Sequence, residues 1–281
     1  MIRDITIGQY YPGYSQIHKL DTRLKILLTF GYMVSVFLAK DFLAYLVIFL
    51  SLCLVVATAE VPFRFILRGL RPVFLIIAFT FVLNLFMTQG TDLVRIGALH
   101  ITREGVYTAC YMALRIIFLI IGCSLLTFTT KPVKLTDGIE ALLKPFVRFG
   151  LPAHELAMMM TIALRFIPTL LEETDKIMKA QQARGADFET GSIFRRAKAM
   201  VPIFIPLIVG AFRMASDLAM AMEARCYRGG EGRTKMHVFR FGRKDAQALA
   251  LFCIYLAVIL VERIFDLQTF MLEMLRTFGM I

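Results

Sequence analysis

The chain has 281 residues, of which 58% are hydrophobic, and its mean hydropathy is +0.69. Soluble domains are about 45–50% apolar, so this composition excludes an ordinary soluble protein and indicates an integral membrane protein. The net charge is +11. Because no nucleic-acid-binding module accompanies it, the excess of Lys and Arg is interpreted as a signal of membrane topology. The five cysteines contain no CxxC pair and predict no disulfide framework.

Five apolar segments are predicted to cross the membrane. Each is close to the roughly 20 residues that a helix needs to cross a hydrocarbon layer of ~30 Å. The expected spans are residues 24–39, 42–59, 72–88, 105–130 and 245–265. Residues 60–71 place Arg64, Arg68 and Arg71 at near-helical spacing, which indicates a helix at the membrane interface. The polar residues 89–104 are expected to form an external loop or a short hairpin.

Residues 131–244 contain two more apolar runs, 151–171 and 199–212, that could also be drawn as spans. Charge argues against this assignment, because it would place the Lys- and Arg-rich segment 172–198 outside the cell. With five spans, all but six of the 32 Lys and Arg residues lie on the same side as the N-terminus. The positive-inside rule therefore predicts a cytoplasmic N-terminus and a C-terminus outside.

The predicted fold is an all-α integral membrane protein with about five transmembrane helices and a cytoplasmic domain of long crossing helices. Its three regions are residues 1–130 with four spans, 131–244 as the cytoplasmic or interfacial domain, and 245–281 with the last span and a short tail. Prolines and glycines delimit two long helices in the middle region, about 153–184 and 193–226, each kinked by an internal proline. Small residues at a spacing of four on the second helix, which favour close helix crossing, are Ala211, Ala215 and Ala219.

An Ala-Arg-small motif ends both long helices. The two copies are Ala183, Arg184 and Gly185 in AQQARGADFE, and Ala224, Arg225 and Cys226 in AMEARCYRGG. A single arginine at a helix end is explained by the helix dipole, which is worth about 0.3–1 kcal/mol, and a following glycine is a common cap. Because the motif occurs twice, we interpret the two arginines as a pair with a shared task.

Two further arginines lie in apolar surroundings. Arg115 is near the middle of the fourth expected span, where an arginine costs about 2.5–3.5 kcal/mol to insert and is functional by default. The alternative is a structural pair with an acid or a backbone carbonyl. Arg165, in ALRFIP, has the same two interpretations. Both are candidates for intramembrane or partner contacts.

Motifs for catalysis are absent from the sequence. It has no GxxxxGK[ST] nucleotide-binding loop and no HExxH motif, and its four histidines stand apart from one another and from any carboxylate pair. The chain is therefore predicted not to be an enzyme. Neither a cofactor nor a metal site is expected.

Three segments together carry a family resemblance. They read GQYYPGYSQIHKLDTRLKIL, ALRFIPTLLEETDKIMKAQQARGADFE and MASDLAMAMEARCYRG. In this order, and over nearly the whole chain, the sequence resembles the transmembrane T component of energy-coupling factor transporters. The resemblance implies a multi-pass subunit of the cell membrane that binds no substrate itself. It would join a membrane S component, which binds a vitamin or another micronutrient, to two cytoplasmic ATP-binding cassette ATPases.

The same resemblance implies a role for the doubled motif. In that family, long coupling helices end in Ala-Arg motifs that dock into grooves on the ATPases. By position, Ala183–Gly185 would engage one ATPase and Ala224–Cys226 the other. Cys226 departs from the Gly or Ser that is usual there, although a small thiol is expected to fit. The alternative function is a self-sufficient permease or channel with Arg115 in its pathway.

Overall fold

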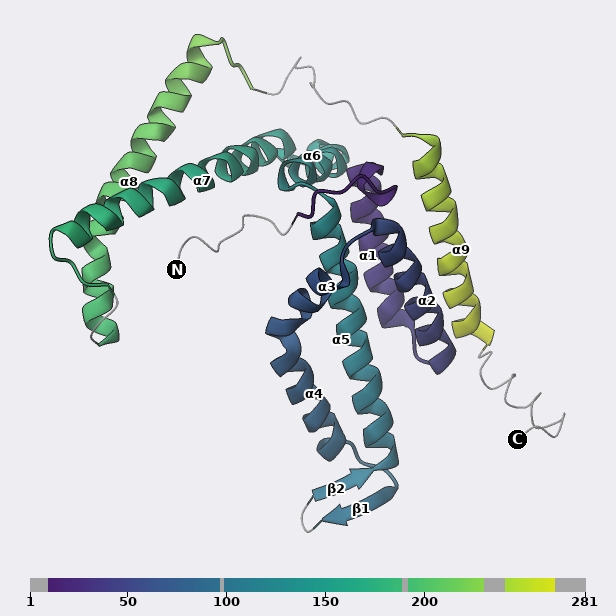
Figure 1. Cartoon of the computed structure of the whole chain (residues 1–281). Helices are drawn as coiled ribbons and strands as arrows, with labels where there is room; N and C mark the ends of the chain where they lie inside the picture. The colour runs from purple at the N-terminus through teal and green to yellow at the C-terminus, as the bar shows by residue number, and fades with distance from the viewer. Residues whose placement is uncertain (1–9, 97–98, 189–191, 230–240, 266–281) are drawn as a thin grey trace, which may run out of the picture. The chain divides into compact units, whose positions relative to one another are not determined.

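The protein is described by a computed structural model that covers residues 10–96, 99–188, 192–229 and 241–265. It divides into two compact units, both helical (Figure 1). The bundle unit comprises Gly8–Lys131 and Phe239–Ile281, and the long-helix unit comprises Met1–Ile7 and Pro132–Val238. The expected tail from residue 266 and the C-terminus lie outside the described residues.

The bundle unit contains most of the described helices and a short hairpin. Its helices are α1 (Thr22–Leu38), α2 (Phe42–Ala59), α3 (Phe63–Leu70), α4 (Phe74–Met87), α5 (Arg103–Thr129) and α9 (Arg243–Phe265), with short 3₁₀ turns at Ile17–Lys19 and Arg71–Val73. Strands β1 (Asp92–Ile96) and β2 (Leu99–Thr102) pair in an antiparallel hairpin. The hairpin expected within 89–104 is therefore confirmed, and it is the small exception to an otherwise all-α fold.

Helix α5 is the centre of the bundle unit. It packs against α1, α2, α3 and α4, while α9 packs against α1 and α2 (Figure 1). The side chains of Val36, Ile48, Phe128 and Ile259 are almost completely buried in the resulting core. Lipid is as apolar as these side chains, so the helices associate through close packing and interhelical hydrogen bonds rather than through a hydrophobic driving force.

One such close contact joins α1 to α5. The hydroxyl of Tyr32 donates to the carbonyl of Phe118 at 3.1 Å, and the ring of Tyr32 lies directly against Gly122. A Cβ atom at position 122 would overlap that ring. The absence of a side chain at Gly122 is therefore what allows the tyrosine to reach its acceptor.

Polar side chains tie the helix termini of the bundle unit together. The ammonium group of Lys25, which is buried, donates to the carbonyl of Thr129 at 3.0 Å, where α5 ends, and to that of His18 at 3.3 Å. The buried Asp245 accepts from the backbone N–H of Asp21 at 2.8 Å and from that of Gly242 at 2.8 Å. These bonds connect the first turns of α1 and α9 and fix the end of α5 beside them.

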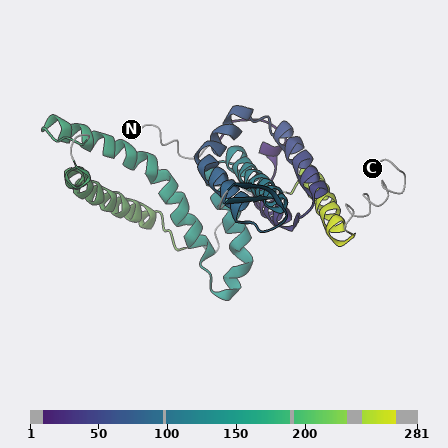
Figure 2. The same cartoon turned by 90° about the horizontal axis from the view of Figure 1, so that it is seen from below.

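The long-helix unit is built from α6 (Pro132–Leu143), a 3₁₀ segment (Lys144–Phe149), α7 (Ala153–Ala183) and α8 (Ile193–Ala224). The two long helices agree with the predicted ranges to within two residues. Prolines 168, 202 and 206 lie inside helices that continue through them. Helices α7 and α8 cross in the view of Figure 1, and the view turned by 90° in Figure 2 shows them side by side.

The alanine stripe predicted to bring the long helices together does not line the groove between them, although Ala211 is partly buried. Ala215 and Ala219 are exposed, whereas Met214, Leu218 and Met222 line the groove that faces α7. Small residues at a spacing of four identify a helix face that another helix can approach closely. They do not identify which helix covers that face, and this is why the prediction failed.

Six helices in the described residues are long and apolar enough to cross a membrane, judged by length and composition alone. Four of the five expected spans are among them, and α1, with 17 residues, is just too short to qualify. Helices α7 and α8 also qualify, as the apolar runs in 131–244 suggested. The assignment of α7 and α8 to the cytoplasmic side depends on charge and remains a prediction.

The contact between Tyr32 and Gly122 provides a test of the packing. Gly122→Ala should lower the free energy of unfolding by about 1–3 kcal/mol, because the added methyl group forces the ring away from Phe118. The measurement is the thermal denaturation midpoint of the purified chain in detergent. Gly69→Ala is the matched control, since its Cβ would make an ordinary 3.4 Å contact with Ser124 and should leave the midpoint unchanged or higher. Equal midpoints for the two variants would contradict the packing argument.

Candidate functional site

The first Ala-Arg motif ends α7 in a Schellman turn. Gly185 has a left-handed backbone conformation, with φ of 88°, and its N–H donates to the carbonyl of Gln182 at 2.9 Å. The N–H of Ala186 donates to the carbonyl of Gln181 at 3.0 Å, which completes the motif. The turn satisfies the last carbonyls of α7 and leaves the side chain of Arg184 exposed.

The second motif repeats this geometry at the end of α8. Cys226 takes the left-handed position with φ of 57°, and its N–H donates to the carbonyl of Glu223 at 2.8 Å. The N–H of Tyr227 donates to the carbonyl of Met222 at 3.0 Å. The two motifs are thus the same backbone structure, although a residue with a side chain fills the glycine position in the second. Arg225 is exposed, as Arg184 is.

Both motif arginines present unpaired guanidinium groups. Within the described ranges, neither Arg184 nor Arg225 forms an ion pair or a side-chain hydrogen bond. A guanidinium carries five N–H donors in a rigid planar fork, which matches a carboxylate or a set of helix C-terminal carbonyls. The flanking residues Ala183 and Ala224 are small and exposed, so a partner surface can approach each fork closely.

A groove of about 420 Å³ runs between α7 and α8. Its lining residues are Ile162, Arg165, Phe166, Met214, Asp217, Leu218, Ala221, Met222 and Arg225. The structure therefore brings together Arg165 and Arg225, two of the residues singled out from the sequence, whereas Arg184 is not part of the groove. Asp217 is the acid in this lining. It forms no ion pair with Arg213, the residue one turn earlier on α8.

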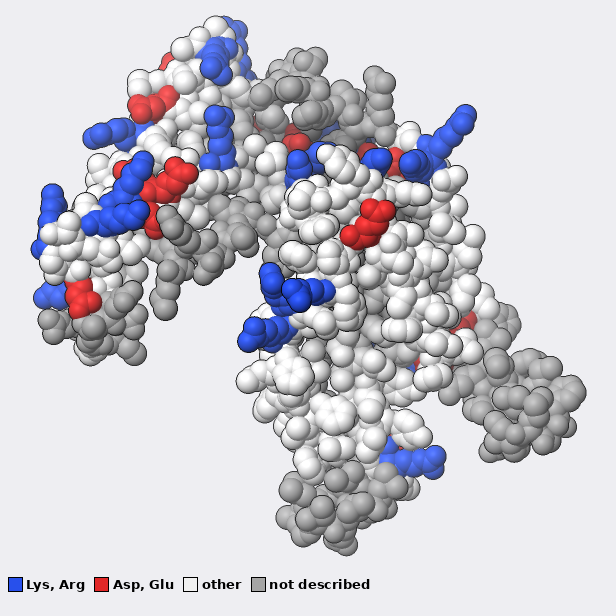
Figure 3. Space-filling model, in the orientation of Figure 1, with Lys and Arg blue, Asp and Glu red and all other residues white. Residues whose placement is uncertain are grey.

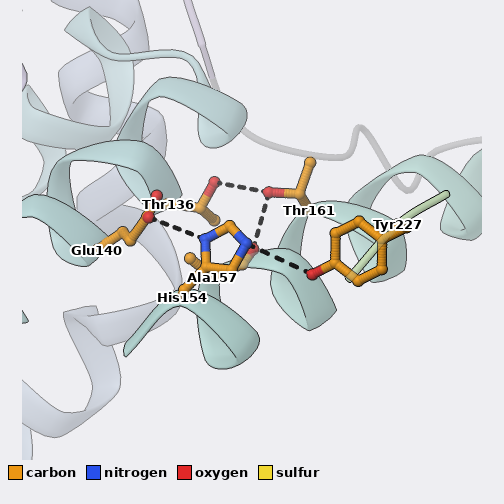
Figure 4. Close-up of polar contacts among 6 residues, drawn as sticks. All are labelled: Thr136, Glu140, His154, Ala157, Thr161 and Tyr227. Carbon is orange, nitrogen blue, oxygen red and sulfur yellow. Dashed lines mark hydrogen bonds and ion pairs between the residues drawn. The ribbon is translucent and has the colours of Figure 1, made fainter. Parts of the chain in front are cut away.

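A polar cluster joins α6, α7 and the end of α8 (Figure 4). Nδ1 of His154 lies 3.2 Å from Oε1 of Glu140, and Nε2 lies 3.5 Å from the hydroxyl of Tyr227. The hydroxyls of Thr136 and Thr161 are 3.5 Å apart beside it. Tyr227 directly follows Cys226, so this cluster ties the second motif to the first turn of α7.

The contact of His154 with a single acid, Glu140, was not predicted from the sequence. Glu140 and His154 are separated by 14 residues, and the short connection between α6 and α7 brings them together. The proline and glycine in that connection were the sequence signal that α6 and α7 lie close together. In the part of the chain that is described, no three His, Cys, Asp or Glu side chains gather as metal ligands.

Arg115 is held by hydrogen bonds inside the bundle unit. Its Nε donates to the hydroxyl of Tyr45 at 3.0 Å, and Nη2 donates to the carbonyl of Ala39 at 3.1 Å, where α1 ends. Arg263 of α9 donates to the neighbouring carbonyl of Leu38 at 3.0 Å. Two cationic side chains thus donate hydrogen bonds to the carbonyls at the C-terminal end of α1, where the helix dipole favours positive charge.

An acid lies at the start of the next helix. Glu262 of α9 is 1% exposed, and its carboxylate lies beside the backbone N–H of Ala44 without reaching hydrogen-bond geometry. Asp41, at the N-cap of α2, makes no capping bond with its side chain. The carboxyl group of Glu262 therefore lies at the first turn of α2, the helix end at which the dipole favours an acidic group. Sequence reasoning missed this residue because it ends a span among apolar neighbours.

Comparison with known proteins identifies the family. The sequence profile of the CbiQ family, described as cobalt transport protein, matches residues 13–237. The energy-coupling factor transporter transmembrane protein EcfT of Thermosediminibacter oceani is 58% identical over 247 residues, which cover 88% of this chain and 93% of that protein. The chain belongs to the EcfT family.

Other EcfT proteins match over similar lengths. The protein of Clostridium kluyveri is 55% identical over 260 residues, covering 90% of this chain and 96% of its own length. That of Bacillus subtilis is 45% identical over 264 residues, covering 94% of this chain and all of its own. The resemblance inferred from the sequence is confirmed, and membership of the EcfT family makes the chain a transport component. With its apolar helices, the chain is a multi-pass membrane protein.

The backbone conformation at the two motifs leads to a prediction. A side chain in the left-handed region costs about 1–2 kcal/mol, so Gly185→Ala should weaken the end of α7 and Cys226→Gly should strengthen the end of α8. Hydrogen exchange should be about 5–30-fold faster at Ala186 in the first variant and slower by a similar factor at Tyr227 in the second. Gly210→Ala, in open space inside α8, is the control and should change exchange at neither site.

A second prediction separates the two interpretations of Arg115. Arg115→Met should lower the free energy of unfolding by about 1–3 kcal/mol, because the carbonyl of Ala39 loses its donor, and Tyr45→Phe should cost less because it removes one bond. Thermal denaturation in detergent measures both. If Arg115 instead lined a transport pathway, the variant would keep its stability and lose transport.

Proposed function

We propose that this chain is the coupling subunit of an energy-coupling factor transporter in the cell membrane. It would join two ATP-binding cassette ATPases in the cytoplasm to a membrane S component that binds a vitamin or another micronutrient. ATP would be bound and hydrolysed by the ATPases, and this chain would supply no catalytic group. The names of its EcfT relatives and the resemblance of its sequence support this assignment.

The observation that carries the proposal is the repeated turn at the ends of α7 and α8. Two separate helix ends have the same Schellman geometry, and each presents an exposed arginine that has no side-chain partner among the described residues. A cap that served only to end a helix would not require an arginine at the same position in both copies. We infer that Ala183–Gly185 docks on one ATPase and Ala224–Cys226 on the other.

Coupling then follows from the lengths of the two helices. Helix α7 has 31 residues and α8 has 32, so each is about 46–48 Å long. When ATP draws the ATPases together, the two tips would move with them, and the helices would carry that motion to the S component. The link from Tyr227 to His154 and Glu140 would transmit displacement of the second tip to α6.

Charge reversal at the tips tests the proposal. The double variant Arg184→Glu, Arg225→Glu should lose co-purification of the ATPases and ATP-dependent uptake. The reason is that each guanidinium group is replaced by a carboxylate, which repels a carboxylate on the partner surface. Pull-down of the assembled complex and uptake in proteoliposomes measure the two effects. Each single variant should weaken assembly less than the double variant does.

Matched controls lie on the same two helices. Lys176→Glu and Arg213→Glu make the same change of charge at exposed positions away from the tips and should keep assembly and uptake. If the double variant assembles and transports as the parent does, the tips are not the docking sites. If the two controls fail as the tip variants do, the loss reflects net charge, and the assignment of the motif is overturned.

A self-sufficient permease or channel is the alternative, and the family relationship does not favour it. Its candidate residue, Arg115, already has hydrogen-bond partners in Tyr45 and Ala39. Reconstitution of this chain alone in liposomes distinguishes the two functions. We expect no substrate movement until the ATPases and the S component are added.

A further inference from the structure

Three arginines form an exposed cationic patch on α3 and the turn that follows it. Arg64, Arg68 and Arg71 recur at intervals of four and three residues, which places them on one face of the helix. All three are exposed. Figure 3 shows a group of blue side chains at the place that α3 has in Figure 1, on a flank of the bundle unit that is otherwise mostly white. We call these residues the α3 patch.

The patch forms no ion pair in the described part of the chain, although the exposed Glu60 lies four residues before Arg64. No ion pair involves any of its three guanidinium groups. The guanidinium of Arg68 lies 5.4 Å from the ring centre of Phe65, which leaves its N–H donors available. Three cations without an ion-pair partner on eight neighbouring residues repel one another, so the arrangement favours an anionic occupant.

An apolar stripe adjoins the patch on the exposed side of the helix. Phe63, Leu67 and Phe74 are 66%, 50% and 70% exposed, whereas Ile66 packs into the core. Helix α4, which follows directly, has no buried residue. Residues Phe63–Met87 together form one of the candidate membrane spans. The arginines therefore stand at the end of an apolar surface that is long enough to face lipid.

We propose that the α3 patch binds the phosphate groups of anionic phospholipids. The exposed apolar stripe would contact the acyl chains, while the guanidinium forks of Arg64, Arg68 and Arg71 bind the headgroup phosphates at the edge of the hydrocarbon layer. Arginine suits this role because its planar fork donates two parallel hydrogen bonds to one phosphate. This site is separate from the docking motifs and does not depend on them.

The surroundings of the patch favour lipid over an acidic protein surface. A protein that covered the arginines would also have to cover Phe63, Leu67 and Phe74 and the outer face of α4, a surface that lipid covers without further contacts. Polar residues that would rim a protein interface are scarce here, since Glu60 is the one acid at its start and the segment 61–79 contains no acid and no amide side chain.

The chain contains no tryptophan, which allows a site-specific test. Phe63→Trp places a single fluorophore beside the patch, and brominated phospholipids quench tryptophan when they bind next to it. The full-length variant is reconstituted in bilayers of phosphatidylcholine with increasing brominated phosphatidylglycerol, and separately with brominated phosphatidylcholine. Each arginine near an anionic headgroup strengthens binding about fivefold. We therefore expect brominated phosphatidylglycerol to bind at least about tenfold more tightly than brominated phosphatidylcholine.

Two controls make the result specific. Phe79→Trp, which is exposed on α4 away from the arginines, should show no preference between the lipids. In the Phe63→Trp background, replacing all three arginines by Gln should abolish the preference. Replacing them by Lys keeps the charge and should retain most of it. Each single Arg→Gln change should reduce it by about fivefold, which tests the proposal even if the triple Gln variant does not fold.

Two outcomes would overturn the proposal. Equal quenching by both lipids in the Phe63→Trp variant shows that no anionic headgroup is bound. If the single and triple Gln variants prefer phosphatidylglycerol as strongly as the Phe63→Trp parent does, the arginines do not bind the anionic headgroup. If the Gln variants keep their lipid preference and instead lose co-purification of a transporter subunit, the patch is a protein-docking surface.

Discussion

The last backbone carbonyls of a helix that ends among lipid or apolar side chains need hydrogen-bond donors from elsewhere in the chain, because those surroundings offer none. At the ends of α1 and α5 the donors are cationic side chains from other helices. Lys25 serves the end of α5, and Arg115 and Arg263 serve the end of α1. Each bond satisfies a carbonyl and at the same time joins two helices. The arrangement of the bundle depends on these few charged contacts.

The long-helix unit meets the same requirement without using side chains. Schellman turns at Gly185 and Cys226 satisfy the carbonyls through backbone N–H groups. The arginine that precedes each turn is therefore not needed as a donor within the chain. In the bundle, Arg115 and Arg263 serve internal structure, whereas the two tip arginines have no side-chain partner among the described residues. Arginines near helix ends in this chain therefore do not all act as carbonyl donors.

Much of the helical architecture could be predicted from the sequence. Long apolar segments identify spans because hydrocarbon thickness sets their length, and Pro152 and Gly185 mark the ends of α7 within two residues. The doubled motif could be found because both copies are local. Contacts between distant residues could not be predicted. Arg115 is 70 residues from Tyr45, and no periodicity connects them.

The candidate site shows the same division between local and distant features. The exposed arginines at the tips could be proposed from sequence, but the groove that brings Arg165 near Arg225 depends on how α7 crosses α8. The pairing of His154 with Glu140 was missed for the same reason, although only a short connection separates their helices. The spacing of small residues on α8 did not predict its contact with α7, because such spacing marks a face of a helix without identifying the helix that covers it.

The left-handed residue at each tip has a consequence for how the sequence can evolve. At position 185 the present glycine accommodates φ of 88° without strain, so any replacement adds the full steric penalty and is opposed by selection on stability. At position 226 a cysteine already bears that penalty. Exchange of Cys226 for another small residue that carries a side chain adds no further penalty of this kind, and only glycine would remove it. Position 226 can therefore accept other small side chains, while position 185 remains constrained to glycine.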